Sequence, residues 1–264
     1  MNNGNIALVL EYDGTRYSGW QIQENAITVQ GCVQKALQAL TGEEIAVNGC
    51  SRTDGGVHAA GYVLNFLTEA TIPGDKFALA LNAFFPEDIT AIDSYEVPAD
   101  FHARFCAKRK TYRYLFYPAS RPSALLSKRV WHIRSVDFDP ADGAVWQDAV
   151  GKMNQAAKLF TGTHDFSAFR AMGSHVKTTV RTIYDAKVYL LPPDFITGHP
   201  VFCFEVTGDG FLYNMVRIMT GTLKDVMMGK IKPDQIASIL ASCKREEAGA
   251  TAPPEGLYLY KVEY

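Results

Sequence analysis

The alternation of hydrophobic and polar residues predicts a strand followed by a helix at the start of the chain. An apolar, β-prone run covers residues 5–13 and ends at the turn signal Asp13-Gly14. Apolar residues then recur at the spacing of one helix face. That face consists of Val29, Cys32, Val33, Ala36, Leu37 and Leu40. We expect Thr28 to cap this helix and Gly42 to stand just past its end.

The same pattern continues through the first hundred residues. It predicts strands at 44–49 and 60–67, a shorter helix at about 75–84 that Pro86 closes, and a strand at 89–96. The resulting order, strand-helix-strand-strand-helix-strand, is typical of a ferredoxin-like unit.

The second half repeats this architecture with one additional helix. We expect strands at 110–117, 180–191, 200–207 and 257–264, and helices at 142–160, 211–228 and 233–243. Pro98 and Asp100 mark the change of segment, so we divide the chain into halves at 1–105 and 106–264. The sequence thus predicts an α+β fold of two ferredoxin-like, RRM-like halves with largely antiparallel sheets. If the sheets join side by side, loops from both halves meet at a central active-site cleft.

Composition excludes several classes of protein. Hydrophobic residues make up 47% and charged residues 20%, as in an ordinary globular protein. No apolar run approaches the roughly 20 residues that span a bilayer, and residues 1–5 lack the basic start of a secretion signal. The five cysteines form no CxxC pair, which argues against a disulfide framework or a zinc site. We expect a cytoplasmic protein.

The net charge of −2 does not by itself indicate nucleic-acid binding, but the charges are unevenly distributed. Five basic residues lie within ten positions and are interleaved with aromatic residues. They are Arg104, Lys108, Arg109, Lys110 and Arg113, with Phe105, Tyr112 and Tyr114 among them. Such a cluster can hold phosphate and stack bases. The alternative is a solvated strand with outward-pointing charges.

Candidate chemistry concentrates in the loop 51–58, between two predicted strands. The adjacent glycines Gly55 and Gly56 let a ligand approach closely, and the carboxylate of Asp54 is a possible nucleophile. Considered alone, an Asp-Gly-Gly sequence is more often a hairpin turn. We interpret His58 as a structural residue at the start of a strand.

A second candidate segment runs from Gly208 to Arg217 and leads into a helix. Its Phe-Leu-Tyr sequence is too bulky for a phosphate-binding loop. Arg217 lies on an otherwise apolar helix face, and a buried arginine needs an anionic partner, for which Asp54 is a candidate. We interpret the isolated pair His164-Asp165 as a turn.

Five stretches of the chain, taken together and in order, resemble the TruA family of tRNA pseudouridine synthases. They are residues 10–21, 51–59, 110–114, 210–217 and 253–259. The family's loop reads G-R-T-D-[AS]-G-V-H-A, and here it reads S-R-T-D-G-G-V-H-A. The two departures, Ser51 and Gly55, are small residues that could alter the mobility of the loop but leave Asp54 in place.

The resemblance implies a role for each of four residues. Asp54 corresponds to the nucleophile and Tyr112 to a tyrosine that packs on the target uracil. Arg217 corresponds to the arginine that pairs with the nucleophile, and Arg52 to one that holds the target nucleotide out of the helix. The resemblance also implies a homodimer that needs no metal or organic cofactor and acts on uridines 38, 39 and 40 of the tRNA anticodon arm.

Several alternatives stay open at this point. Asp54 could attack C1′ of the sugar, attack C6 of the base, or draw a proton from the sugar as the base departs. A non-catalytic RNA-binding protein with two RRM-like sheets would explain the architecture but not the Asp54 loop. An aspartate-dependent hydrolase of glycosides or nucleosides normally requires a second carboxylate near the first, and none stands out.

Overall fold

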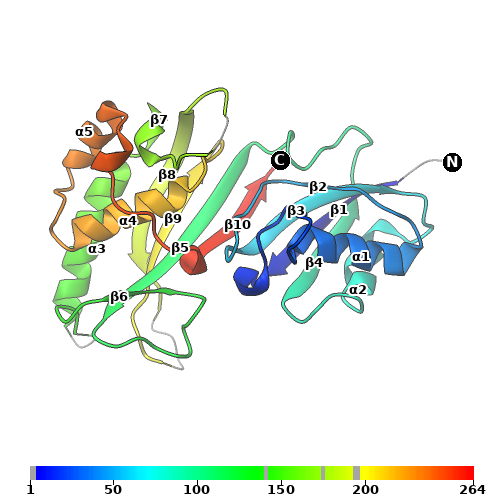
Figure 1. Ribbon diagram of the computed structural model, residues 1–264, viewed down its shortest axis with the longest axis horizontal. Helices are drawn as coiled ribbons and strands as arrows, with labels where there is room; N and C mark the ends of the chain where they lie inside the picture. Colours follow the sequence, from blue (N-terminus) through cyan, green and yellow to red (C-terminus); the bar gives the residue numbers. More distant parts are fainter. Residues whose placement is uncertain (1–3, 140–141, 174–175, 193–196) are drawn as a thin grey trace. The chain divides into compact units, whose positions relative to one another are not determined.

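The computed structural model describes residues 4–139, 142–173, 176–192 and 197–264. It has a mixed α+β fold that divides into two compact units (Figure 1). The first unit comprises Met1–Lys110 and Tyr258–Tyr264, and the second comprises Thr111–Leu257. The C-terminal strand therefore belongs to the same unit as the N-terminal strand.

The first unit is a sheet with two helices packed against it (Figure 1). Its elements are β1 (Gly4–Tyr12), the short 3-10 helix η1 (Gly14–Arg16), α1 (Val29–Thr41), β2 (Val47–Gly49), β3 (His58–Thr68), η2 (Gly74–Lys76), α2 (Phe77–Leu81), β4 (Ile89–Glu96) and β10 (Leu257–Glu263). The strand order is β4-β1-β3, and both β2 and β10 pair with β3. The β10 pairing is parallel and the others are antiparallel.

Helix α1 confirms the sequence prediction at both ends. The Thr28 hydroxyl accepts a hydrogen bond from the Gly31 N–H at 3.3 Å, which satisfies a donor that the first turn leaves open. Gly42 ends the helix in the left-handed conformation, with φ of 79°. Val29, Val33, Ala36 and Leu37 are buried. The strand expected at 44–49 is shorter, and so is the helix expected at 75–84.

The second unit contains further strands and three α-helices among its described residues (Figure 1). Its elements are β5 (Arg109–Ala119), β6 (Trp131–Arg134), α3 (Gly143–Lys158), β7 (Gly162–Asp165), η3 (Ser167–Phe169), β8 (Val180–Leu190), β9 (Phe202–Gly208), α4 (Met215–Met227), α5 (Gln235–Ser242), η4 (Arg245–Glu247) and η5 (Pro254–Gly256). The strand order is β5-β9-β8-β7, with β6 parallel to β5. Aromatic rings fill the core, where Phe202 stacks on Phe116 and on Trp146.

Two predictions for this half were wrong in detail, and two short strands were not predicted. The pair His164-Asp165 lies in strand β7, opposite Arg181 and Val180 of β8, and is not a turn. Helix α4 begins at Met215 and not near residue 211, because Asn214 takes the left-handed conformation with φ of 60°. The sequence pattern did not indicate β6 or β7, which are four residues each.

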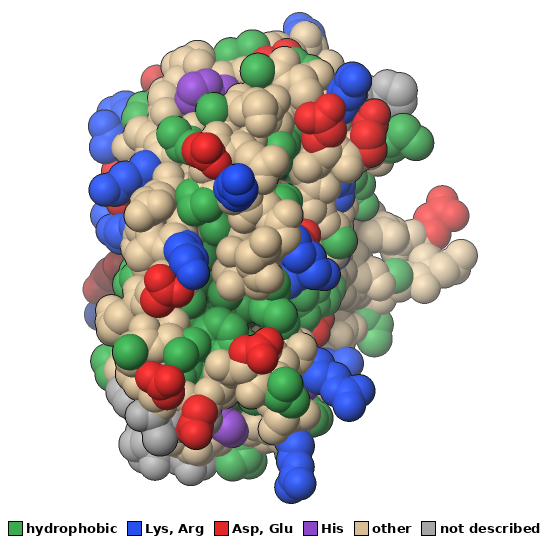
Figure 2. Space-filling model, turned by 90° about the vertical axis from the view of Figure 1, so that its left-hand side faces the viewer, with side chains coloured by type: hydrophobic (Ala, Val, Ile, Leu, Met, Phe, Trp, Pro, Cys, Tyr) green, Lys and Arg blue, Asp and Glu red, His purple; other side chains and the backbone are tan. Residues whose placement is uncertain are grey.

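The face of the second unit that bears α3 and α5 carries charges of both signs. Figure 2 shows Lys and Arg side chains interspersed with Asp and Glu around a hydrophobic area on the side that bears α3 and α5. Mixed charges of this kind do not concentrate a positive potential as a polyanion site requires. Within the described ranges, the helices are all too short or too polar to cross a bilayer.

Candidate active site

The loop between β2 and β3, which carries Asp54, is held by the segment 12–20 that follows β1. The Tyr12 hydroxyl lies 2.8 Å from the Thr53 hydroxyl in a buried hydrogen bond. The backbone N–H of Trp20 donates to the Thr53 carbonyl at 3.0 Å, and the backbone N–H of Gly56 donates to the Tyr17 carbonyl at 3.2 Å. Two of the five family-like stretches, 10–21 and 51–59, are therefore hydrogen-bonded to each other.

Glycines in the segment 12–20 make this close approach possible. A Cβ at Gly14 would lie 2.0 Å from the Val57 carbonyl oxygen, far inside contact distance. A Cβ at Gly19 would lie 2.4 Å from the Thr53 carbonyl oxygen, and Gly19 also has φ of +88°. Any larger residue would push the loop away from the segment that holds it.

The carbonyl groups just before Asp54 are also fixed. The Tyr62 hydroxyl donates to the Ser51 carbonyl at 2.5 Å. The Lys110 ammonium donates to the Cys50 carbonyl at 2.8 Å. Lys110 is partly buried, and this burial lowers its pKa. Lys110 therefore acts inside the protein and does not present its charge to solvent as the basic cluster suggested.

Asp54 itself heads a tight turn. The Val57 N–H donates to the Asp54 carbonyl at 3.2 Å, and Gly56 takes φ of 77°. The turn that an Asp-Gly-Gly sequence favours is thus present, and it leaves Asp54 partly exposed between fixed neighbours. Arg52, two positions earlier, is exposed.

His58 is a structural residue, as expected. Its side chain is 1% exposed, and its ring stacks on Tyr258 with ring centroids 4.7 Å apart. The Gly14 N–H donates to Nδ1 at 3.0 Å, and the Asp13 carboxylate lies 3.2 Å from the same nitrogen. His58 fixes the first residue of β3 to the turn after β1.

Asp88, which precedes β4, binds residues in and next to η1. Its carboxylate accepts Arg16 Nε at 2.7 Å and the Tyr17 hydroxyl, and its carbonyl accepts the Asp13 N–H at 3.0 Å. Burial acts to raise the pKa of Asp88, but the hydrogen bonds from Arg16 and Tyr17 outweigh it and leave the pKa below its ordinary value.

Tyr112 lies on β5 in the second unit. The side chain is 6% exposed, and its ring meets Phe211 edge-on with centroids 5.0 Å apart. The neighbouring Arg113 pairs with Glu205 at 2.7 Å. A second residue of the basic cluster, Arg113, is therefore paired within the protein. The members that remain exposed are Arg104, Lys108 and Arg109.

Arg217, on α4, is half-buried and bound to two oxygens. Its Nε donates to the Ala252 carbonyl and its Nη1 to the Asn214 side chain, both at 2.7 Å. Tyr114 of β5 donates to the Pro253 carbonyl at 2.6 Å. Residues of three further family-like stretches are therefore in contact within the second unit, through Tyr112 with Phe211 and Tyr114 with Pro253.

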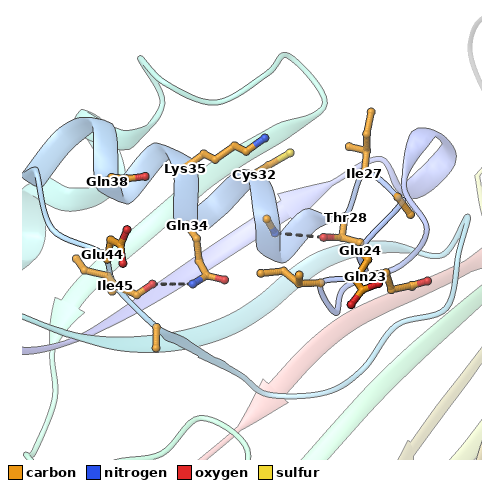
Figure 3. A pocket seen from close by; sticks show the side chains of 14 residues that line it. Gln23, Glu24, Ile27, Thr28, Cys32, Gln34, Lys35, Gln38, Glu44 and Ile45 are labelled. Carbon is orange, nitrogen blue, oxygen red and sulfur yellow. Dashed lines mark hydrogen bonds between the residues drawn. The ribbon is translucent and has the colours of Figure 1, made fainter.

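The structure also forms a pocket of about 620 Å³ in the first unit. Figure 3 shows that it lies beside the first turns of α1, where Gln34 reaches the Ile45 carbonyl at 2.9 Å and Ile27 and Glu24 point from the preceding loop. None of its lining residues belongs to the Asp54 loop. Across the described part of the chain, no three His, Cys, Asp or Glu side chains are grouped as metal ligands.

Sequence reasoning missed the residues that hold the loop. Thr53, Gly14 and Lys110 became visible as partners only through contacts between distant positions. The density of Gly and aromatic residues in 10–21 was a sequence signal for Gly14 alone. Of the four predicted site residues, Asp54 and Arg52 lie in the first unit and Tyr112 and Arg217 in the second.

Comparison with known proteins places the chain in a family. A family model described as tRNA pseudouridine synthase matches residues 8–106 and 156–264. The chain is 52% identical over 261 residues to tRNA pseudouridine synthase A of Acetivibrio thermocellus, covering 98% of this chain and 99% of the relative. It is 49% identical over 259 residues to tRNA pseudouridine synthase A of Ruminiclostridium cellulolyticum, covering 98% and 99%. The chain belongs to the tRNA pseudouridine synthase family, whose members are isomerases.

Proposed function

We propose that this protein converts uridine to pseudouridine at positions 38, 39 and 40 of the tRNA anticodon arm, with Asp54 as the nucleophile. Family membership supports the reaction and the tRNA substrate. The geometry of the loop supports Asp54, because the residues on both sides of a partly exposed carboxylate are held by hydrogen bonds. A nucleophile fixed in this way loses little freedom when the substrate arrives.

The reaction is an isomerisation and balances without a co-reactant. The N1–C1′ bond breaks, the base turns, and a C5–C1′ bond forms. The proton on C5 leaves and N1 ends with a proton. Asp54 assists by attack at C1′, by attack at C6, or by taking a sugar proton, and all three routes need its carboxylate.

The target uridine must leave the base stack, which costs a few kcal/mol. Stacking on an aromatic ring recovers about 1–3 kcal/mol. We assign this role to Tyr112, whose ring orientation is fixed by its edge contact with Phe211. We assign to Arg52, which is exposed on the Asp54 loop, the role of occupying the space that the flipped nucleotide leaves.

Arg217 is proposed as the cationic partner of Asp54. Its hydrogen bonds to Ala252 and Asn214 hold the guanidinium in one orientation. An arginine so oriented can form charge-assisted hydrogen bonds that align a carboxylate and favour its ionised form.

The remaining expectations belong to the same proposal. They are a ferredoxin-like organisation of both halves, a homodimer, a cytoplasmic location, and catalysis without a metal or organic cofactor. The strand order β4-β1-β3-β2 with intervening helices supports the first of these for the N-terminal half.

The experiment is to incubate purified protein with unmodified tRNA transcripts and map pseudouridine at each nucleotide, with and without a chelator. We expect product at uridines 38 to 40 in both conditions, and none in transcripts that carry cytidine there. RNA that is bound but unchanged would favour a non-catalytic RNA-binding protein. Release of uracil would favour a hydrolase.

A further inference from the structure

The segment between β4 and β5 presents an aromatic ring to solvent. Phe105 is 74% exposed. A single exposed apolar side chain needs no explanation on its own. Phe105 differs because a polar ring and a cation accompany it: the His102 ring lies 4.3 Å away, centroid to centroid, and the Arg104 guanidinium carbon lies 5.6 Å from the ring centroid.

Local hydrogen bonds hold this ring outward. The Phe105 and Cys106 N–H groups both donate to the His102 carbonyl, at 3.1 and 2.9 Å. The Arg104 N–H donates to the His102 ring nitrogen Nδ1 at 3.1 Å. The backbone between residues 102 and 106 is therefore a closed turn, and within it the His102 ring and the Arg104 guanidinium lie against the Phe105 ring.

A buried polar network anchors the base of this turn. Asn65 donates to the Asn5 side chain and accepts the Ala103 N–H, both at 2.9 Å. Asn5 in turn donates to the Phe101 carbonyl at 3.0 Å. Both asparagines are almost fully buried, and buried amides are tolerated when they are hydrogen-bonded as these are. The core of the first unit thus fixes the point from which Phe105 extends.

The local charge suits a polyanion. Residues 100–110 contain four Lys or Arg residues and one acidic residue, Asp100. Lys110 points inward to Cys50, whereas Arg104 and Lys108 are exposed. Glu263 lies nearby and is paired with Lys261 at 2.8 Å. An exposed aromatic face beside exposed cations is the arrangement that binds an unpaired nucleotide, with the base stacked and the phosphate paired.

We propose that Phe105, with His102, Arg104 and Lys108, forms a nucleotide-binding platform for an unpaired RNA base other than the target uridine. The proposal rests on the proposed function in one respect, namely that the ligand is the RNA substrate. It is separate from Asp54 chemistry because the platform acts in binding. A second copy of this chain is the competing occupant of the same surface.

The test measures the affinity of the full-length protein for an anticodon-arm hairpin RNA, using Phe105→Ala, Phe105→Leu and Phe105→Trp. We expect the Ala and Leu variants to bind roughly 5- to 100-fold more weakly and the Trp variant to bind like the wild type, because stacking needs an aromatic face. Leu79→Ala is the matched control, since Leu79 is 76% exposed on α2 of the same unit, and it should not alter affinity.

Salt dependence and mass separate the remaining outcomes. Arg104→Ala should reduce the slope of log affinity against log salt by about one ion. Wild-type affinity in Phe105→Ala and Phe105→Leu overturns the proposal. The proposal is also overturned if Phe105→Ala changes the oligomeric state of the protein while Phe105→Leu keeps the wild-type state. That result would show that the surface contacts a second copy through an apolar side chain. If wild-type protein binds the hairpin but forms no pseudouridine, the proposed function fails while the platform is still judged by these affinities.

Discussion

Two segments of the first unit carry side chains with proposed roles, Asp54 in one and Phe105 in the other, and the two segments are supported in different ways. The Asp54 loop is held along its length, through Thr53, Gly56 and the carbonyls of Cys50 and Ser51. The turn at 102–106 is anchored at its base, and Phe105 projects from it with most of its surface in water.

The difference matches the demands of the two proposed roles. A reacting carboxylate must stand within a fraction of an ångström of its target, so its loop needs partners on all sides. A platform for an unpaired base gains affinity from exposed area and charge and tolerates small displacements. Mutations that shift the loop should therefore lower the rate, and mutations on the platform should lower the affinity.

Gly14→Ala should have the largest effect among substitutions that leave Asp54 intact. The new methyl group would lie 2.0 Å from the Val57 carbonyl oxygen, so the loop or the turn after β1 must move. A displacement of about 1 Å costs on the order of 100-fold in rate, and we expect a lower melting temperature as well. Single-turnover kinetics at saturating RNA measure the first and thermal unfolding the second.

Gly151→Ala is the control for this substitution. Gly151 lies in α3, and no neighbouring group comes within 4 Å of the place that an alanine methyl would take there. Alanine should leave the rate unchanged and raise stability slightly, by about 0.5–1 kcal/mol. A Gly14→Ala enzyme with the wild-type rate would show that the loop does not depend on the segment that surrounds it.

Lys110→Met tests whether the hydrogen bond from Lys110 to the Asp54 loop affects the reaction rate or the binding of RNA. Methionine keeps most of the length of the apolar stem but removes the donor to the Cys50 carbonyl. A hydrogen bond from a charged group contributes about 1.5–3 kcal/mol, so we expect a rate loss of roughly tenfold or more with affinity for RNA little changed. The comparison is with Lys108→Met, which removes an exposed charge two positions away and should weaken binding instead. If the two variants behave alike, the distinction between loop and platform fails.

Asp88→Asn should have the smallest effect, because the Asp88 carboxylate acts on the loop through Arg16 and Tyr17. We expect a loss of about 1 kcal/mol in the free energy of unfolding at pH 7, as Tyr17 exchanges a charged acceptor for a neutral one. The pKa of Asp88 is lowered in the folded state. Its stabilising contribution is therefore present above the ordinary pKa of about 3.9 and disappears as the pH falls through the lowered folded value.

Denaturant unfolding of the wild type and Asp88→Asn at pH 7 and at successively lower pH checks this sign. The difference between them should shrink toward acid pH. Asp75→Asn provides the control, since Asp75 is an exposed carboxylate paired with Lys76 beside it in the chain, and it should give no difference at pH 7. A gap between wild type and Asp88→Asn that widens as the pH falls would refute the role given to Asp88.

Local signals explain which parts of the fold could be predicted. Helix α1 was predicted with its caps because Thr28 and Gly42 act within one turn of its ends. Strand β7 could not be, because its pairing with β8 depends on residues about 17 positions away and four residues carry little periodicity. The start of α4 was misplaced because the left-handed conformation of Asn214 is not visible in the apolar pattern.

The candidate site divides in the same way. Asp54 and its glycines were found because they are adjacent in the sequence. The contacts that fix them, from Tyr12 to Thr53 and from Lys110 to Cys50, join positions 41 and 60 residues apart. The hydrophobic periodicity of the sequence does not predict hydrogen bonds between such distant positions. The inward direction of Lys110 likewise depends on tertiary packing, so the basic cluster looked larger in the sequence than it is on the surface.

The most direct measurement of the central claim is tritium release from 5-tritiated uridine in an anticodon-arm substrate by Asp54→Asn. The amide has nearly the shape of the carboxylate but cannot act as a nucleophile or base. We expect release to be abolished while the affinity for the RNA stays close to that of the wild type. Robust release by Asp54→Asn would contradict the account.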